Sequence, residues 1–189
     1  MRYLFCVIGQ LLCCLLGPVA ILGWAAPPAH PKPRLVTSFL PAYCFAVNVA
    51  GNLAEVENLT AGSVSPHDLQ LSPSELRRLG TADLVVVNGL ELEPWLKRAL
   101  EAQAGGHRPA VVELAAGLER ELIRRGTGLN PHVWLDPVLA AQAVTNVLVA
   151  LQRLAPAYAA GYALNAERYL RCLAQLDAQA QVALAPLKE

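Results

Sequence analysis

The segment DLVVVNG at residues 83–89 contains the clearest β-strand signal in the chain. Its apolar residues, Leu84 to Val87, follow one another without a polar interruption, whereas a half-buried strand alternates apolar and polar residues. An uninterrupted run of this kind is typical of a strand that is buried on both faces of a parallel sheet, with helices covering each face. The segment therefore predicts an α/β fold.

Short apolar segments on either side of this strand predict the rest of the sheet. Further strands are expected at 34–38, 56–60 and 110–114, and helices at 41–50, 72–80, 94–105 and 138–154. Strand and helix alternate four times, which favours a four-stranded parallel sheet flanked by helices. The loop from 115 to 129 is polar and is expected to contain no regular element.

A last helical pattern begins at Pro156 and continues to the end of the sequence. Its apolar residues recur at helical spacing and form one stripe, which consists of Tyr162, Tyr169, Leu173, Leu176, Ala180, Leu184 and Leu187. A helix from Ala157 to Leu187 measures on the order of 45 Å at 1.5 Å per residue. Its stripe has no evident partner within the chain, and Pro186 is expected to bend or end it.

The segment NPHVWLDP at residues 130–137 holds a histidine between a proline and a predicted helix start. Asp136 can cap the free N–H groups of that helix, and Pro137 suits its first turn because proline has no N–H. His67 also follows a proline, in another loop that connects a strand to a helix. Ligands of parallel sheets bind at the carboxyl ends of the strands, where both loops fall. His67 and His132 are therefore predicted to form half of a transition-metal site.

Charge and composition restrict the partners of the chain. Its 189 residues carry 15 Lys and Arg against 15 Asp and Glu, which gives a formal net charge of +0. A balanced chain of this kind gives no reason to expect nucleic acid or a strongly anionic surface as partner.

The first 26 residues predict a secretory signal peptide. One arginine precedes a long apolar run over residues 4–24, and small residues follow at Ala25 and Ala26. Cleavage near these alanines would place the mature protein in the periplasm or another extracytoplasmic space. A membrane anchor that is never cleaved is the alternative, since the run is close to the ~20 residues that span a bilayer. A lipid anchor is not favoured, because neither Cys13 nor Cys14 follows a small residue.

The cysteines that follow the predicted signal peptide, Cys44 and Cys172, both lie within helical patterns. A disulfide is chemically allowed in an exported protein. We nevertheless expect two buried, unpaired thiols that pack as small hydrophobic side chains. No CxxC motif occurs, so neither a thiolate metal site nor a redox motif is indicated.

Four ordered blocks of sequence resemble the substrate-binding proteins of bacterial ABC transporters for zinc and manganese, the TroA-like metal-binding family. The blocks are VTSFLP at 36–41, SPHDLQLSPSEL at 65–76, ADLVVVNGLELEPW at 82–95 and NPHVWLDP at 130–137. The resemblance implies a non-enzymatic protein with two α/β lobes, joined by one long rigid helix, that buries the metal between them. It maps His67 and His132 onto the two ligands of the N-terminal lobe. It also implies zinc or manganese as the transported ligand and the membrane permease of an ABC transporter as the partner.

The same resemblance implies three segments in this chain: a signal peptide at 1–26, an N-terminal metal-binding lobe at 27–154 and a linking helix at 155–189. The chain stops at Glu189, so the second lobe is expected to be missing. In the family that lobe supplies a histidine or glutamate and an aspartate or glutamate. The family usually has aspartate where Asn130 stands. Residues 115–129 contain no histidine, unlike the corresponding loop of many zinc members, which leaves zinc and manganese as equal alternatives.

The remaining polar and aromatic candidates are expected to have no direct role. His107 is expected in a solvated loop, and His30 lies in a proline-rich leader. Glu91 and Glu93 precede a helix and are expected to be solvated rather than to form the paired acids of a hydrolase. Trp95, like Trp134, is expected to pack in the core.

Two alternatives to metal uptake stay open. One is a metal-dependent hydrolase that uses His67 and His132 to activate a water molecule. Such an enzyme needs an open coordination position and a general base, and no HExxH-like unit or Ser-His-acid arrangement is visible. The other is a shortened relative that binds no metal and serves as an interaction module.

Overall fold

The computed structural model describes residues 30–60, 65, 67, 69–102, 107–125 and 128–187. The predicted signal peptide lies outside these residues. The elements follow in the order β1 Arg34–Thr37, α1 Leu40–Ala50, β2 Glu55–Asn58, α2 Pro73–Gly80, β3 Leu84–Val87, α3 Leu96–Glu101, β4 Ala110–Glu113, β5 Arg124–Arg125, β6 Gly128–Leu129, η1 Val133–Leu135, α4 Pro137–Leu154, η2 Pro156–Tyr158, α5 Ala159–Leu184 and η3 Ala185–Leu187.

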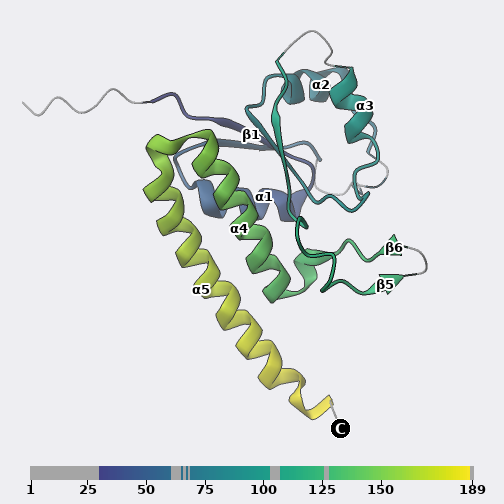
Figure 1. Ribbon diagram of the computed structural model, residues 1–189, viewed down its shortest axis with the longest axis vertical. Helices are drawn as coiled ribbons and strands as arrows, with labels where there is room; N and C mark the ends of the chain where they lie inside the picture. Colours follow the sequence, from purple (N-terminus) through teal and green to yellow (C-terminus); the bar gives the residue numbers. More distant parts are fainter. Residues whose placement is uncertain are drawn as a thin grey trace, which may run out of the picture. The chain divides into compact units, whose positions relative to one another are not determined.

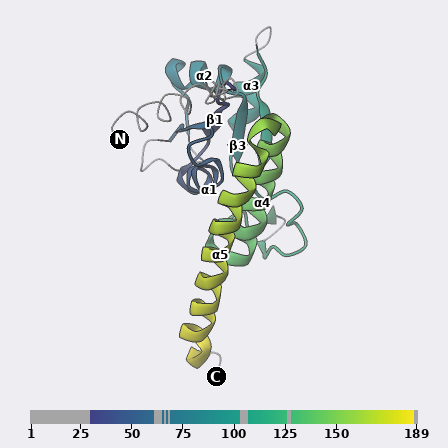
Figure 2. The ribbon, with the colours of Figure 1, turned by 90° about the vertical axis from the view of Figure 1, so that its left-hand side faces the viewer.

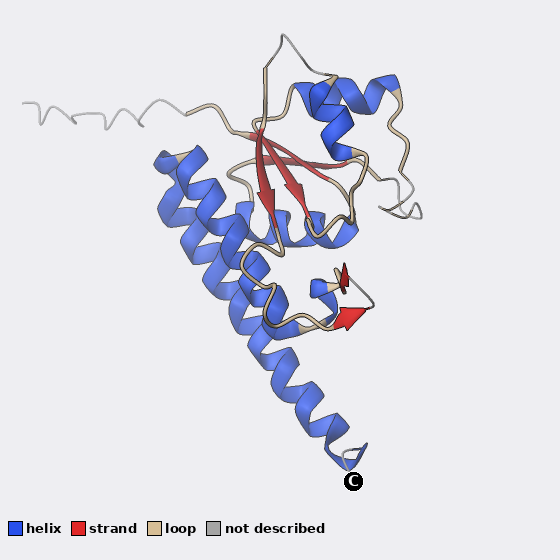
Figure 3. Ribbon diagram, turned by 45° about the vertical axis from the view of Figure 1, so that its right-hand side comes forward, coloured by secondary structure: helices blue, strands red, loops and turns tan. Residues whose placement is uncertain are grey.

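Four parallel strands form the central sheet in the order β2-β1-β3-β4 (Figure 3). Helices α1, α4 and α5 pack on one face of the sheet, and α2 and α3 pack on the other (Figure 1). The prediction of an α/β fold with a four-stranded parallel sheet flanked by helices is therefore confirmed. All four strands run in the same direction, so their carboxyl ends meet at one edge of the sheet.

β3 is buried on both of its faces. Leu84 and Val86 pack among α1, α4 and α5, whereas Val85 and Val87 pack among α2 and α3. None of the four side chains is more than 2% exposed. This two-sided burial explains why the apolar run in β3 has no polar interruption.

Two parts of the chain differ from the prediction. α3 is shorter than expected, with Ala102 as its C-cap. The predicted polar loop after β4 contains a small antiparallel hairpin, β5 with β6. Strands of two residues are too short to show the alternation that predicts a strand, and β5 consists of two arginines.

α4 and α5 pack against each other and against α1. Five residues of α4 are buried, namely Ala140, Ala143, Val144, Val147 and Leu151. α4 is long and apolar enough to cross a membrane. Its buried face, however, belongs to the same apolar cluster as the sheet and α1, which is the arrangement of a core helix.

The first half of α5 is anchored to α1 and to the turn that follows it. The Tyr162 hydroxyl donates to the carbonyl oxygen of Leu53 at 3.4 Å, and Asn165 Nδ2 donates to the carbonyl oxygen of Val49 at 3.2 Å. Burial raises the pKa of Tyr162 to about 12. Leu173 is the last buried residue among the described residues of α5. Beyond it the helix continues past the N-terminal end of α4 (Figure 2).

The second half of α5 exposes much of its predicted apolar stripe. Leu176 and Leu184 are 52% and 51% exposed. The helix ends at Leu184, and Pro186 lies in the short helix η3, as its ring predicts. Cys172 is exposed, which contradicts the prediction of a buried thiol, whereas Cys44 is half-buried. Cys172 directly precedes the buried Leu173, so it lies about 100° around the helix from the packed face.

Glu93 is a buried carboxyl group at the carboxyl edge of the sheet, so the prediction of a solvated side chain was wrong. Ser38 Oγ donates to its Oε1 at 2.7 Å, and the backbone N–H of Asn88 donates to the same oxygen at 2.8 Å. The N–H of Gly89 donates to Oε2 at 3.2 Å. Because Ser38 follows β1 and Asn88 follows β3, this carboxyl group ties the ends of two strands together. Burial raises the pKa of Glu93 above its ordinary value, although the hydrogen bonds act in the opposite direction.

A tight loop after β3 makes these hydrogen bonds possible. Gly89, Leu90 and Glu91 have φ angles of 80°, 53° and 61°. The positive φ of Gly89 favours glycine, and a Cβ atom there would lie 2.8 Å from Glu113 Oε2, so the Glu113 side chain would have to shift. The tight loop thereby brings the Glu93 side chain back against the end of β3, only a few residues after the strand.

Replacing Leu84 with alanine is expected to lower the free energy of unfolding by about 2–5 kcal/mol, because a cavity would form in the central strand. The matched control is Leu184→Ala, on the exposed side of α5, which should change it by less than about 0.5 kcal/mol. Urea denaturation of both variants measures these values. Equal losses for the two leucines would contradict a core centred on β3.

Glu93 is expected to make the protein less stable as the pH rises. Its pKa is raised in the folded state, so its contribution is fully present below the ordinary value of 4.5 and is lost as the pH rises through the raised value. In Glu93→Gln this pH dependence should disappear. Urea denaturation between about pH 4 and pH 8 measures the unfolding free energies of both proteins. With rising pH, the wild type should lose stability relative to Glu93→Gln.

The control for this measurement is Glu91→Gln, which changes an exposed carboxylate in the same loop. Its curve should run parallel to that of the wild type. A constant difference between the wild type and Glu93→Gln across this pH range would contradict the raised pKa of Glu93.

Candidate metal site

His132 lies directly before η1, and its backbone is fixed on both sides. Asn88 Nδ2 donates to the carbonyl oxygen of Pro131 at 2.9 Å, so the residue that follows β3 holds the peptide in front of the histidine. On the other side, Asp136 Oδ1 accepts two backbone N–H bonds from the first turn of α4, at 2.8 and 3.3 Å. The predicted helix cap at Asp136 is therefore confirmed.

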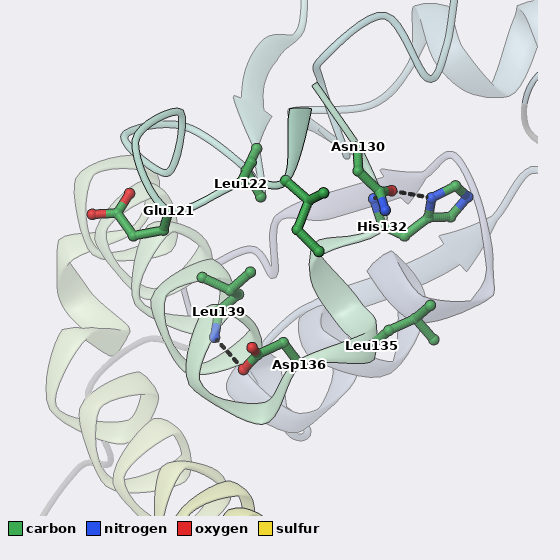
Figure 4. Close-up of a pocket in the computed structure, with 8 residues that line it drawn as sticks. Glu121, Leu122, Asn130, His132, Leu135, Asp136 and Leu139 are labelled. Carbon is green, nitrogen blue, oxygen red and sulfur yellow. Dashed lines mark hydrogen bonds between the residues drawn. The ribbon is translucent and has the colours of Figure 1, made fainter. Parts of the chain in front are cut away.

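The imidazole ring of His132 is held by an amide and an indole. Asn130 Oδ1 accepts the backbone N–H of His132 at 3.2 Å and also hydrogen-bonds its ring Nδ1 (Figure 4). The Trp134 ring meets the imidazole edge-on, with ring centroids 5.1 Å apart and an interplanar angle of 66°. Trp134 in turn packs against Phe39, just after β1, at a centroid distance of 4.7 Å.

His67 approaches His132 from the loop between β2 and α2. Its backbone N–H donates to Ser65 Oγ at 3.3 Å, and its side chain is exposed. The two imidazole centroids are 6.3 Å apart, with an interplanar angle of 58°. The structure thus brings together the two histidines that were predicted from separate loops.

Two imidazoles at this separation can bind one metal ion after a small adjustment. Zinc–nitrogen bonds of about 2.0–2.1 Å at a tetrahedral angle put the two ring centroids roughly 5 Å apart. The observed 6.3 Å is therefore about an ångström too long for that geometry. Because the His67 side chain is exposed, we expect it to rotate toward His132 when a metal binds.

The other titratable side chains of the described residues do not add to this pair. Within those residues, no group of three or more His, Cys, Asp or Glu side chains is placed to hold a metal ion. Asp136 is engaged by the helix start, and Glu93 by the ends of β1 and β3. His107 has its Nε2 2.9 Å from the carbonyl oxygen of Ala82, just before β3 and therefore at the opposite edge of the sheet.

A shallow hollow opens beside His132 (Figure 4). It is lined by Glu121, Leu122, Ile123, Asn130, His132, Leu135, Asp136 and Leu139. Ile123 and Leu135 are each 74% exposed. His132 therefore borders an accessible and partly apolar surface.

Three residues that position the site were not predicted to do so: Asn88, Glu93 and Asn130. Glu93 accepts from Ser38, 55 residues away, and Asn88 donates to Pro131, 43 residues away, so no local pattern reveals these contacts. Asn130 lies two residues before His132, a spacing at which an asparagine side chain commonly bonds the backbone, and this signal could have found it. Asp68 directly follows His67 in the sequence, but it lies outside the residues that the structure describes.

Comparison with known proteins gives one consistent family. The family model described as zinc-uptake complex component A, periplasmic, matches residues 35–189. The match therefore runs from β1 through α5 and includes the loops that carry both histidines.

Two curated relatives are named for different metals. The high-affinity zinc uptake system protein ZnuA of Bacillus subtilis is 31% identical over 158 residues, which are 77% of this chain and 50% of that protein. The iron-binding protein YfeA of Yersinia pestis is 35% identical over 150 residues, which are 78% and 47% of the two chains.

A solved structure shares the fold. The substrate-binding protein FpvC of Pseudomonas aeruginosa, in complex with Mn²⁺, superposes with a TM-score of 0.72 at 28% identity, covering 80% of this chain and 56% of that one. This chain thus spans about half the length of the relatives it matches, with 50% and 47% for the first two. It belongs to the family of the zinc-uptake component A, the metal-binding substrate-binding proteins of ABC transporters.

Proposed function

We propose that this chain captures zinc or manganese outside the cytoplasm through His67 and His132, for uptake by the permease of an ABC transporter. The observation that carries the proposal is the approach of the two imidazoles to a centroid distance of 6.3 Å at the carboxyl edge of the sheet. Both rings come from segments at the same edge of one sheet, so the fold already brings them close together before a metal binds.

Imidazole nitrogen suits the first-row divalent metals. It binds zinc readily, and it binds manganese when carboxylate oxygens complete the coordination sphere. Relatives of this chain are named for zinc and for iron, and one was solved with manganese. The imidazole pair alone therefore fits several of these ions, and the ligands that complete the site decide among them.

We infer that the remaining ligands come from a second lobe. A closed zinc site has four ligands, and the described residues bring two imidazoles together. In this proposal residues 1–26 are an export signal, residues 27–154 form the N-terminal metal-binding lobe, and residues 155–189 form the helix that leads to the second lobe. The exposed apolar side chains in the second half of α5 support this assignment, because a lobe packed there would bury them.

Binding and release, without a chemical step, fits the site better than hydrolysis. A metal-dependent hydrolase needs a general base close to its metal-bound water. Asp136, the carboxylate nearest in sequence to His132, is engaged as the cap of α4. Loss of metal binding in the histidine variants described next would also distinguish this function from that of an interaction module.

Replacing His67 or His132 with alanine is expected to weaken zinc binding by at least tenfold, which corresponds to about 1.4 kcal/mol or more. The physical reason is the loss of one coordinate bond from a site with few protein ligands. Competition with a chromogenic zinc chelator measures the affinity, and far-UV circular dichroism checks that the fold is retained.

His107→Ala is the matched control, since His107 lies at the opposite edge of the sheet, beside Ala82. Its zinc affinity should equal that of the wild type. An equal loss in all three variants, or no loss in the first two, would show that these histidines do not bind the metal.

A further inference from the structure

The hydrogen bonds around Asn130 determine the orientation of its amide group. One atom of that amide faces both the backbone N–H of His132, at 3.2 Å, and the ring Nδ1. A backbone N–H can only donate, so the atom that it meets is the amide oxygen and not the nitrogen. The amide orientation therefore follows from a donor whose position is fixed by the main chain.

The same oxygen determines where the imidazole carries its proton. An amide oxygen has no hydrogen to give, so Nδ1 must supply the hydrogen in its bond to Asn130. In a neutral imidazole the other nitrogen, Nε2, then keeps its lone pair. Figure 4 shows Nε2 on the side of the ring that points away from Asn130.

We propose that Asn130 is a positioning residue that holds His132 in the Nδ1–H tautomer and leaves the Nε2 lone pair open for the metal. The role in metal binding rests on the function proposed above, whereas the tautomer is a property of the metal-free protein. Asn130 acts on the ring directly, and Asn88 acts on the preceding peptide through the Pro131 carbonyl.

Two contacts together favour one orientation of the ring. Asn130 fixes the Nδ1 side, and the Trp134 ring meets the imidazole at a centroid distance of 5.1 Å. Rotating the ring by half a turn about the Cβ–Cγ bond would place Cδ2 against the Asn130 amide in place of Nδ1, and so remove the hydrogen bond. Without the Asn130 carbonyl, the ring is therefore free to rotate, and neither tautomer is favoured by that hydrogen bond.

Nitrogen NMR tests the tautomer directly. Long-range ¹H–¹⁵N correlation spectra of the metal-free, full-length chain, recorded at a pH where imidazole is neutral, distinguish Nδ1–H from Nε2–H. We expect His132 to be the Nδ1–H form in the wild type and in Asn130→Asp, whose carboxylate also accepts. In Asn130→Ala a population of the Nε2–H form should appear.

Competitive zinc titration of the same proteins tests the consequence. Loss of a partner that orients a ligating histidine typically costs about 10–100-fold in metal affinity. We expect a loss of this size in Asn130→Ala and none in Asn130→Asp. The matched control is Asn52→Ala, which changes an exposed asparagine in the turn between α1 and β2.

The two measurements separate the inference about Asn130 from the proposed metal binding. An Nε2–H form of His132 in the wild type, or an unchanged tautomer in Asn130→Ala, overturns the inference about Asn130. If instead the tautomer follows Asn130 while His132→Ala binds zinc like the wild type, the proposed function fails, and with it the metal role of Asn130. Since Asn130→Asp keeps the acceptor, its behaviour separates loss of the hydrogen bond from loss of the fold.

Discussion

Burial of β3 on both faces is the constraint on which the rest of the molecule depends. A strand with no solvent face must be covered by helices on each side, and its neighbours must reach it by crossovers that return each strand in the same direction. All loops that follow strands then emerge at one edge of the sheet. The loop that carries His67, the loop that carries Glu93 and the segment that leads to His132 all belong to this edge.

A buried polar network connects the ends of β1 and β3 to the segment that carries His132. Glu93 receives hydrogen bonds from residues at the ends of β1 and β3, and Asn88 passes the connection on to the Pro131 carbonyl. A carboxyl group in such surroundings is costly unless donors surround it, so the network allows few alternative arrangements. The position of His132 is thereby coupled to the centre of the sheet rather than to a surface loop alone.

The features with a local signal were predictable from the sequence, and those that depend on distant contacts were not. The apolar run of β3 and the capping residue Asp136 each predicted what the structure contains, because each acts within a few residues. Burial of Glu93 depends on Ser38, which is 55 residues away, and no periodicity encodes it.

Two further differences between the prediction and the structure have similar causes. The β5–β6 hairpin is stabilised by pairing between two very short strands and not by a pattern of its own residues. The exposure of Cys172 depends on which face of α5 meets α1, which the helical pattern alone defines only to within a neighbouring position.

The central claim is that His67 and His132 share one metal ion. Diffraction from zinc-loaded crystals of the protein, recorded on both sides of the zinc absorption edge, tests it most directly. The account predicts one anomalous peak about 2.0–2.1 Å from an imidazole nitrogen of each histidine, with Nε2 as the ligating atom of His132. A peak that contacts only one of the two rings, or one that lies at His107 instead, would contradict it.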